Sequence, residues 1–310
     1  MRIESLLTEA EISEEFAEAL EARDLPEKFF YWSPMSVRAW QALSRDLAFE
    51  SCLHSWNLLV HDSESIAREF NQAISVVSLG AGSGAKDLLL VKALEQAGKR
   101  VEYLPVDASM PLLERACAAA EESEIEALGL KADISSPVHL VLISDTPEHP
   151  RLYLLCGNTL GGFDPLDELM QLASCMRAGD RLIVDAELAD GSALPSRDHP
   201  VGRRFALAPL TAIGVGPDDG EVLFELREDD RHAGLEVVTR HFHVARDLRL
   251  HLPEREIPVQ RGERINLNFN YTYSPEAFRW LLTERAGLHI LREYPSPDGR
   301  YVTAVCARSR

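Results

Sequence analysis

Residues 74–98, ISVVSLGAGSGAKDLLLVKALEQAG, decide the fold. The first six are small or apolar and partly β-branched, as in a short buried strand. They run into the turn Gly80-Ala81-Gly82-Ser83-Gly84, and the residues after it have the apolar spacing of a helix that ends at Gly98. A strand, a glycine turn and a helix in this order form the first unit of a nucleotide-binding fold.

The same alternation continues to residue 188 and predicts a parallel sheet with helices on its faces. The last two apolar segments of the chain read as a hairpin around the turn PSPDG, and a methyltransferase sheet ends with such an antiparallel strand beside the fifth. We therefore predict an α/β fold of the class I methyltransferase type, with a Rossmann-like seven-stranded sheet and an antiparallel C-terminal strand. The expected strands after the first are 100–106, 125–130, 152–156, 181–188, 288–294 and 300–307.

The pattern changes after residue 189 and predicts an inserted α+β cap. The segment that follows is rich in proline, glycine and charge, and its strands lack partner helices. Residues 221–226 and 235–252 alternate with period two, as paired antiparallel strands do. The expected parts are an N-terminal helical segment that contributes to the cap, a cofactor-binding core and the inserted cap, at residues 1–65, 66–189 with 274–310, and 190–273.

The composition excludes several classes of partner. The 310 residues include 32 basic and 50 acidic side chains, a net charge of −18, which opposes attraction to nucleic acid or to an anionic membrane. No apolar run approaches the roughly 18 residues of a membrane span, and the N-terminus lacks a signal-peptide core, so we expect a cytoplasmic protein. The five widely spaced cysteines indicate reduced core thiols. His241 and His243 lack a third ligand, so no metal site is expected.

A carboxylate follows the glycine turn at the distance that an adenosine-containing cofactor requires. Asp107 ends the second expected strand about 25 residues after the turn, where it can accept both ribose hydroxyls. Asp133 ends the third, near the expected adenine rim. These features serve NAD and S-adenosylmethionine equally well, but the C-terminal hairpin favours S-adenosylmethionine. An NAD(P)-dependent oxidoreductase and a cofactor-binding protein without catalytic activity remain the alternatives.

Five segments of the chain carry a family resemblance: LPEKFFY at 25–31, LGAGSGAK at 79–86, VDAS at 106–109, Ala132-Asp133 and CGNTLGGF at 156–163. Taken in order, they resemble the histidine-specific Nα-methyltransferases of ergothioneine biosynthesis, and the last segment is the most distinctive. The resemblance implies a class I methyltransferase that uses S-adenosylmethionine. The cofactor-binding residues expected from it and from the neighbouring strand ends are Tyr31, Gly80, Ala81, Gly82, Lys86, Asp107, Ala108, Ala132, Asp133, Gly157 and Thr159.

The substrate side departs from the family's pattern. Family members follow the Gly-x-Thr-[Ile/Leu]-Gly stretch with an asparagine that holds the substrate, where this chain has Gly162. A stretch whose glutamate and serine hold the imidazole reads INLNFN at 265–270 here, with Asn268 and Asn270 at the matching places. Residues 42–46 lack the expected tyrosine. These changes argue against histidine, because charge-assisted hydrogen bonds decide specificity by orders of magnitude.

Methyl transfer from a sulfonium is an in-line displacement, so the protein must position the acceptor, keep an amine neutral and exclude water. The candidate catalytic residues are Asn158, Thr159 and Glu187, of which Glu187 can pair with an ammonium or take its proton. We predict a methyltransferase for the amine of an amino acid or related small molecule other than histidine. The candidate substrate-binding residues are Gly162, Asn266, Asn268, Asn270 and Tyr273.

The three asparagines at 266, 268 and 270 alternate with apolar residues, as the polar face of one strand does. A sheet edge that faces solvent gives the same alternation, and Tyr273, an aromatic residue before a helix, is also typical of a core. Glu187 is equally consistent with an ordinary surface carboxylate.

Overall fold

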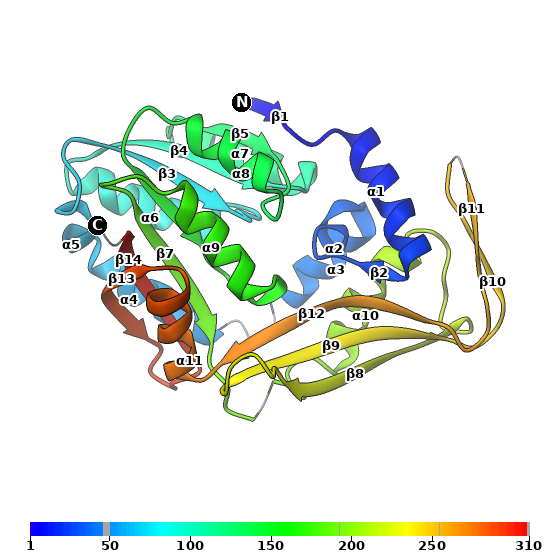
Figure 1. Ribbon diagram of the computed structural model, residues 1–310. Coiled ribbons are helices and arrows are strands. Elements are labelled where there is room, and N and C mark those ends of the chain that lie inside the picture. The colour runs from blue at the N-terminus through cyan, green and yellow to red at the C-terminus, as the bar shows by residue number, and fades with distance from the viewer. Residues whose placement is uncertain (46–49, 192, 254, 309–310) are drawn as a thin grey trace.

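The computed structural model describes residues 1–45, 50–191, 193–253 and 255–308, and its α/β core is joined to a second layer of sheet and helices (Figure 1). Within these residues the core sheet has eight strands. In chain order they are β1 (Arg2–Ser5), β3 (Ala73–Leu79), β4 (Arg100–Asp107), β5 (Leu128–Lys131), β6 (Arg151–Leu155), β7 (Arg181–Glu187), β13 (Leu288–Pro295) and β14 (Tyr301–Arg308).

The strand order is β1-β5-β4-β3-β6-β7-β14-β13, and the strands from β1 to β7 pair in parallel. Strand β14 is antiparallel to both of its neighbours, with Tyr301 opposite Glu187 of β7. The expected methyltransferase-type sheet with its antiparallel C-terminal strand is confirmed. The order reverses between β3 and β6, and in open α/β sheets ligands bind at this kind of switch point.

An eighth strand extends the sheet beyond the seven that were expected. Strand β1 pairs in parallel with β5, with Arg2 opposite Leu128. Three of its four residues are exposed and two are charged, so they carry no apolar pattern that would have revealed a strand. The expected division of the chain into a core and a cap stays a prediction. Strand pairing places residues 2–5 in the core sheet and residues 24–25 in the second sheet, so the N-terminal segment contributes to both.

Helices cover both faces of the core sheet, and the pleat sends alternate side chains to each face. Val76 of β3 packs on one face and Val77 on the other. The first face is covered by α4 (Glu50–His61), α5 (Ser63–Ala67), α6 (Ala85–Gln96) and α7 (Met110–Glu122). The second is covered by α8 (Pro137–Asp145), α9 (Pro165–Cys175), α11 (Pro275–Trp280) and the helical turns η2 (Leu160–Gly162) and η3 (Leu281–Arg285).

The cap has its own sheet and its own apolar core. The sheet consists of β2 (Asp24–Leu25), β12 (Arg264–Tyr273), β9 (Leu235–Val244) and β8 (Gly220–Glu228), in this order. The cap helices are α1 (Glu9–Ala22), α2 (Phe29–Trp32), α3 (Pro34–Leu43) and α10 (Pro200–Thr211). Figure 1 shows a hairpin at the far end of the cap, formed by β10 (Leu248–His251) and β11 (Glu256–Val259).

Two expected strands differ from the structure. The strand expected at 125–130 is β5, which begins only at Leu128. The long strand expected at 235–252 breaks into β9, which pairs with β8 and β12, and β10, which pairs with β11 in a separate two-stranded sheet. In the part of the chain that the structure describes, no helix has both the length and the apolar character needed to cross a bilayer.

Candidate active site

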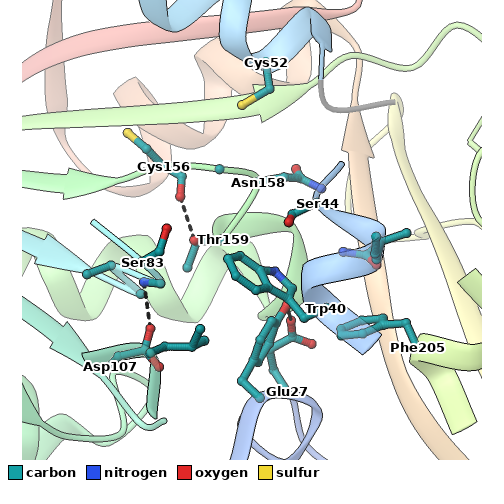
Figure 2. Close-up of a pocket in the computed structure, with 18 of the residues that line it drawn as sticks. Glu27, Trp40, Ser44, Cys52, Ser83, Asp107, Cys156, Asn158, Thr159 and Phe205 are labelled. Atoms are coloured by element: carbon teal, nitrogen blue, oxygen red, sulfur yellow. Dashed lines mark hydrogen bonds between the residues drawn. The ribbon is translucent and has the colours of Figure 1, made fainter. Parts of the chain in front are cut away.

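A cavity of about 370 Å³ lies where the carboxyl ends of the core strands meet the cap (Figure 2). The core lines it with the turns after β3, β4, β5 and β6 and with the end of β7, and the cap lines it from α2, α3, α10, β8, β9 and β12. The cavity brings together all the residues that were expected at the cofactor: Tyr31, Gly80, Ala81, Gly82, Lys86, Asp107, Ala108, Ala132, Asp133, Gly157 and Thr159.

Trp40 lines this cavity, and its ring lies close to Gly82 of the glycine turn and packs against Tyr31. Figure 2 shows Asp107 and Thr159 on one side of the indole and Phe205 on the other. The part over the glycine turn is here called the cofactor side, and the part under the cap is called the acceptor side. The cofactor side is defined by Gly80, Gly82, Lys86, Asp107 and Gly157, and the acceptor side by Glu27, Phe205, Phe224, Arg240 and Asn270.

The glycine turn requires glycine for two reasons. Gly80, Gly82 and Gly84 have φ values of +74°, +57° and +71°, in the left-handed region that side chains disfavour. A Cβ atom on Gly80 would lie 3.1 Å from Cγ2 of Thr159, and one on Gly82 would lie 3.2 Å from Cη2 of Trp40. The backbone of the turn is therefore the wall of the cavity itself, and a bound molecule can approach it closely.

Asp107 is fixed by the backbone around it. Its Oδ2 accepts a hydrogen bond from the N–H of Gly82 at 2.9 Å, and its Oδ1 accepts one from the N–H of Ser109 at 2.8 Å. Burial raises the pKa of Asp107 to about 6, against the effect of these two hydrogen bonds. Asp107 lines the cavity, and a carboxylate has about four lone-pair sites, so the group can still accept hydrogen bonds from a ligand there.

Asp185 of β7 positions the backbone of the turn after β6, and it was not identified from the sequence. Its Oδ2 accepts from the N–H of Gly157 at 2.6 Å and its Oδ1 from the N–H of Asn158 at 2.8 Å. These bonds hold both residues in the left-handed region, with φ values of +84° and +61°. The available signal was a carboxylate inside the apolar strand RLIVDAE.

Lys86 presents a partly buried ammonium to the cofactor side. Its Nζ donates to Sγ of Cys52 at 3.9 Å, and it forms no ion pair with any residue that the structure describes. Burial opposes the charge, but the nearby Cys52 and Asp185 raise the pKa of Lys86 above its ordinary value. A Cβ atom on Gly157 would lie 2.8 Å from Nζ, so the glycine leaves room for the ammonium.

Asp133 links the core to the cap. Its Oδ2 accepts from Nζ of Lys28 at 2.7 Å, and its Oδ1 accepts from the N–H of Ser135 at 2.9 Å. Burial raises the pKa of Asp133, but Lys28 and Ser135 outweigh that effect and lower it. The carboxylate that was expected at the adenine rim is therefore paired with a cap lysine.

The three candidate catalytic residues all line the cavity. Glu187 is held by Arg197, whose Nη1 and Nη2 donate to its two oxygens at 3.2 and 2.6 Å, and the Tyr301 hydroxyl lies 3.3 Å from Oε2. Thr159 donates its hydroxyl to the carbonyl of Cys156 at 2.8 Å. Oδ1 of Asn158 is buried without a hydrogen-bond partner among the described residues. Both carboxylate oxygens of Glu187 are therefore already bonded to Arg197.

The candidate substrate residues are dispersed. Only Asn270 lines the main cavity, where its Oδ1 accepts from Nη2 of Arg240. Gly162 and Asn268 line a neighbouring cavity of about 140 Å³. Asn266 is exposed beside β2, and Tyr273 is fully buried outside the lining of both cavities.

A β-bulge between Asn266 and Phe269 breaks the single polar face that was expected, and it leaves Asn268 with φ +54°. Of the segment 42–46, Ser44 lines the main cavity and Asp46 lies outside the described residues.

The acceptor side consists mainly of residues that were not expected from the sequence. Phe205 of α10 packs against the ring of Tyr31 at 5.7 Å between centroids, and Trp40 packs against the same ring at 6.1 Å. Arg240 of β9 is buried, and its Nε has no partner among the described residues. These residues come from elements far apart in the chain, and no local motif joins them.

A family model matches a large part of the chain: that of the histidine-specific, S-adenosylmethionine-dependent methyltransferases, over residues 10–194. 4-Dimethylallyltryptophan N-methyltransferase from Aspergillus fumigatus is 25% identical over 316 aligned residues, which cover 94% of this chain and 91% of that protein. Histidine N-alpha-methyltransferase from Mycobacterium tuberculosis is 30% identical over 138 residues, 42% of each chain. A solved S-adenosylmethionine-dependent methyltransferase from Clostridium acetobutylicum aligns with a TM-score of 0.48 at 13% identity, over 88% of this chain and 99% of that one.

Proposed function

The chain belongs to the family of histidine-specific, S-adenosylmethionine-dependent methyltransferases, and we propose that its own acceptor is the amine of an amino acid or related small molecule that is larger and more apolar than histidine. As a family member the protein is an S-adenosylmethionine-dependent methyltransferase. The oxidoreductase alternative is thereby removed.

The cofactor side offers a group for each polar part of S-adenosylmethionine, which supplies an electrophilic methyl group when bound. The carboxylate of Asp107 has a free lone pair on each oxygen for the ribose hydroxyls. The ammonium of Lys86 has donors left for the carboxylate of the amino-acid part. The turn at Gly80 and Gly82 leaves the backbone open to close approach.

The lining of the acceptor side carries the proposal. Its walls combine aromatic and aliphatic side chains with the polar groups of Glu27, Arg240 and Asn270, which suits an acceptor with a large apolar body and a polar head. An imidazole would need polar partners, but the positions that match those partners are Asn268, outside the main cavity, and Asn270, bonded to Arg240. The apolar lining residues are Trp40, Leu43, Phe163, Phe205 and Phe224.

The relative from Aspergillus fumigatus supports the same acceptor class. Its name gives an N-methyltransferase of 4-dimethylallyltryptophan, an amino acid with a large apolar side chain, and it is similar to this chain over 94% of the length. The histidine enzyme from Mycobacterium tuberculosis is similar over only 42%. We place the reaction in the cytoplasm, which the five free cysteines of the described residues support.

The test is transfer of a labelled methyl group. The protein is incubated with methyl-deuterated S-adenosylmethionine and one of L-histidine, L-tryptophan, 4-dimethylallyltryptophan or tryptamine, and products are identified by mass spectrometry. We expect a labelled N-methyl product from an indole amine, none from histidine, and none with Asp107→Ala. Labelled histidine would contradict the proposed acceptor. Binding of S-adenosylhomocysteine without any labelled product would favour the non-catalytic alternative.

A further inference from the structure

Glu27 has an unused carboxylate oxygen at the boundary of both cavities. The residue lies in the turn before α2 and lines the main cavity and its smaller neighbour. The Tyr31 hydroxyl donates to Oε1 at 2.6 Å, whereas Oε2 is buried and has no partner among the described residues. A buried carboxylate oxygen without a hydrogen bond is costly, so such an oxygen beside a cavity indicates a partner that comes from outside the chain.

The backbone opposite Glu27 is shaped to leave this carboxyl in place. Gly162 ends the helical turn η2, and a Cβ atom there would lie 2.8 Å from Cδ of Glu27 and 3.0 Å from Oε1. Any side chain at position 162 would therefore push the carboxyl away. Gly162 and Glu27 are a matched pair, although they are far apart in the chain.

Charged side chains lie across the cavity from Glu27. Arg240 faces it from β9 and Tyr31 from α2, and the ion pair of Lys28 with Asp133 lines both cavities. Among the described residues, no ion pair joins Glu27 to Arg240, whose Nη2 instead donates to the carbonyl of Phe269 at 3.3 Å and to Asn270.

Burial raises the pKa of Glu27 to about 7, although Arg240 and the Tyr31 hydroxyl both lower it. Burial and Glu27 together raise the pKa of Tyr31, so its hydroxyl stays a donor. A carboxyl that titrates near neutral pH can both accept and release a proton there.

We propose that Glu27 is a catalytic residue that binds the ammonium group of the acceptor through Oε2 and removes its proton before methyl transfer. This inference rests on the proposed amine acceptor. Arg240, across the cavity, is placed to attract the acceptor's carboxylate when it has one. Glu187 is less suited to this part, because both of its oxygens already accept hydrogen bonds from Arg197.

The step balances in protons and electrons. The ammonium gives one proton to the carboxylate of Glu27 and becomes a neutral amine. The lone pair of this amine forms the new N–C bond while the methyl–sulfur bond breaks, and the electron pair of that bond stays on sulfur as a neutral thioether. The product nitrogen carries the positive charge that the sulfonium lost, and the proton on Glu27 returns to solvent.

The test compares Glu27→Gln, which keeps the shape and removes the base, with the wild type over a pH series. We expect kcat/KM of the wild type to rise as pH passes about 7 and to fall when the free acceptor loses its own proton. Glu27→Gln should lose about 100-fold in kcat/KM near neutral pH and should gain activity only as the acceptor deprotonates in solution. Calorimetry should show unchanged binding of S-adenosylhomocysteine, which also reports a folded protein.

Glu168→Gln is the matched control. Glu168 is a buried carboxyl on α9 whose pKa burial also raises, to about 8, and it lines neither cavity. We expect its kcat/KM and pH profile to equal those of the wild type. An equal loss in this control, or a Glu27→Gln protein that keeps the rise across pH 7, would overturn the role of Glu27.

A second measurement needs no turnover and separates this inference from the proposed function. Infrared difference spectra between wild type and Glu27→Gln, both with S-adenosylhomocysteine, isolate the carboxyl band of Glu27. We expect the protonated band to disappear between about pH 6 and pH 8 and to change when L-tryptophan is added. Failure of every amine in the panel would sink the proposed function, whereas a band that does not titrate there would sink the role of Glu27.

Discussion

The cofactor side and the acceptor side of one cavity are built in different ways. On the cofactor side the contacts are made by backbone: glycines with positive φ form the wall, and Asp107 and Asp185 are fixed by main-chain N–H groups. On the acceptor side the contacts are side chains from α10, β8, β9, β12 and the turn before α2, and Glu27 and Arg240 each have an atom without a partner among the described residues. The backbone contacts of the cofactor side suit a single ligand. The side chains of the acceptor side leave polar atoms for an acceptor, and the names of the relatives give different acceptors.

The largest effect is expected on the cofactor side. Asp107→Ala removes a carboxylate placed to accept two ribose hydroxyls, and each such charged hydrogen bond contributes about 1.5 kcal/mol or more. We therefore expect the affinity for S-adenosylhomocysteine to fall by at least about 100-fold, measured by calorimetry. Asp145→Ala, which removes an exposed carboxylate on α8, is the control. Unchanged affinity in Asp107→Ala would break the assignment of this side to the cofactor.

The next largest effect is expected on the free energy of unfolding and comes from Glu27 on the acceptor side. Because the pKa of Glu27 is raised from its ordinary value of 4.5 to about 7, the folded protein holds a proton that the unfolded chain has released, and stability falls as pH rises between these values. Glu27→Gln avoids this loss, so we expect about 2 kcal/mol more stability at pH 8 and little difference at pH 4.

Urea unfolding at the two pH values measures this difference in stability. Glu95→Gln, an exposed change on α6, should alter neither value. Equal stability of Glu27→Gln and the wild type at pH 8 would show that the carboxyl is better solvated than its surroundings indicate.

The smallest expected effect tests whether a change on the acceptor side leaves binding on the cofactor side intact. Gly162→Ala places a methyl group 2.8 Å from Cδ of Glu27, so the carboxyl must move. We expect kcat/KM for the amine to fall about 10-fold while the affinity for S-adenosylhomocysteine stays constant. Gly216→Ala, where a Cβ atom would find only an ordinary contact, is the control. In a Glu27→Ala background the change at 162 should cost nothing further, and an additive loss would show that the two residues act independently.

The fold and the cofactor side were largely predictable because their signals are local. The run from Ile74 to Gly98 contains a strand, a turn and a helix in consecutive residues, and Asp107 directly follows the next strand. Helix α8 was not expected: its apolar residues lie on its exposed face as well as its buried one, with Val138 67% exposed, so no amphipathic period marks it.

The acceptor side was not predictable, because tertiary contacts decide it. Asn268 was expected to share a face with Asn266 and Asn270, but a bulge turns it toward the smaller cavity. The pairing of Glu27 with Gly162 depends on how the N-terminal segment docks on the turn after β6, which no spacing in the sequence encodes. Asp185 was visible as a charge in an apolar strand, but its role required the positions of the two N–H groups above it.

Strand β1 gives the first residues of the chain a protective role. It pairs with β5, and the N–H groups of Leu6 and Leu7 continue this pairing onto the carbonyl of Lys131. Without it, β5 would present a row of unpaired backbone groups at the margin of a largely parallel sheet, and such a margin is a template on which other chains add and aggregate. Strand β1 forms the margin in its place, and because it is only four residues long and carries the charges of Arg2 and Glu4, it is a poorer template for another chain.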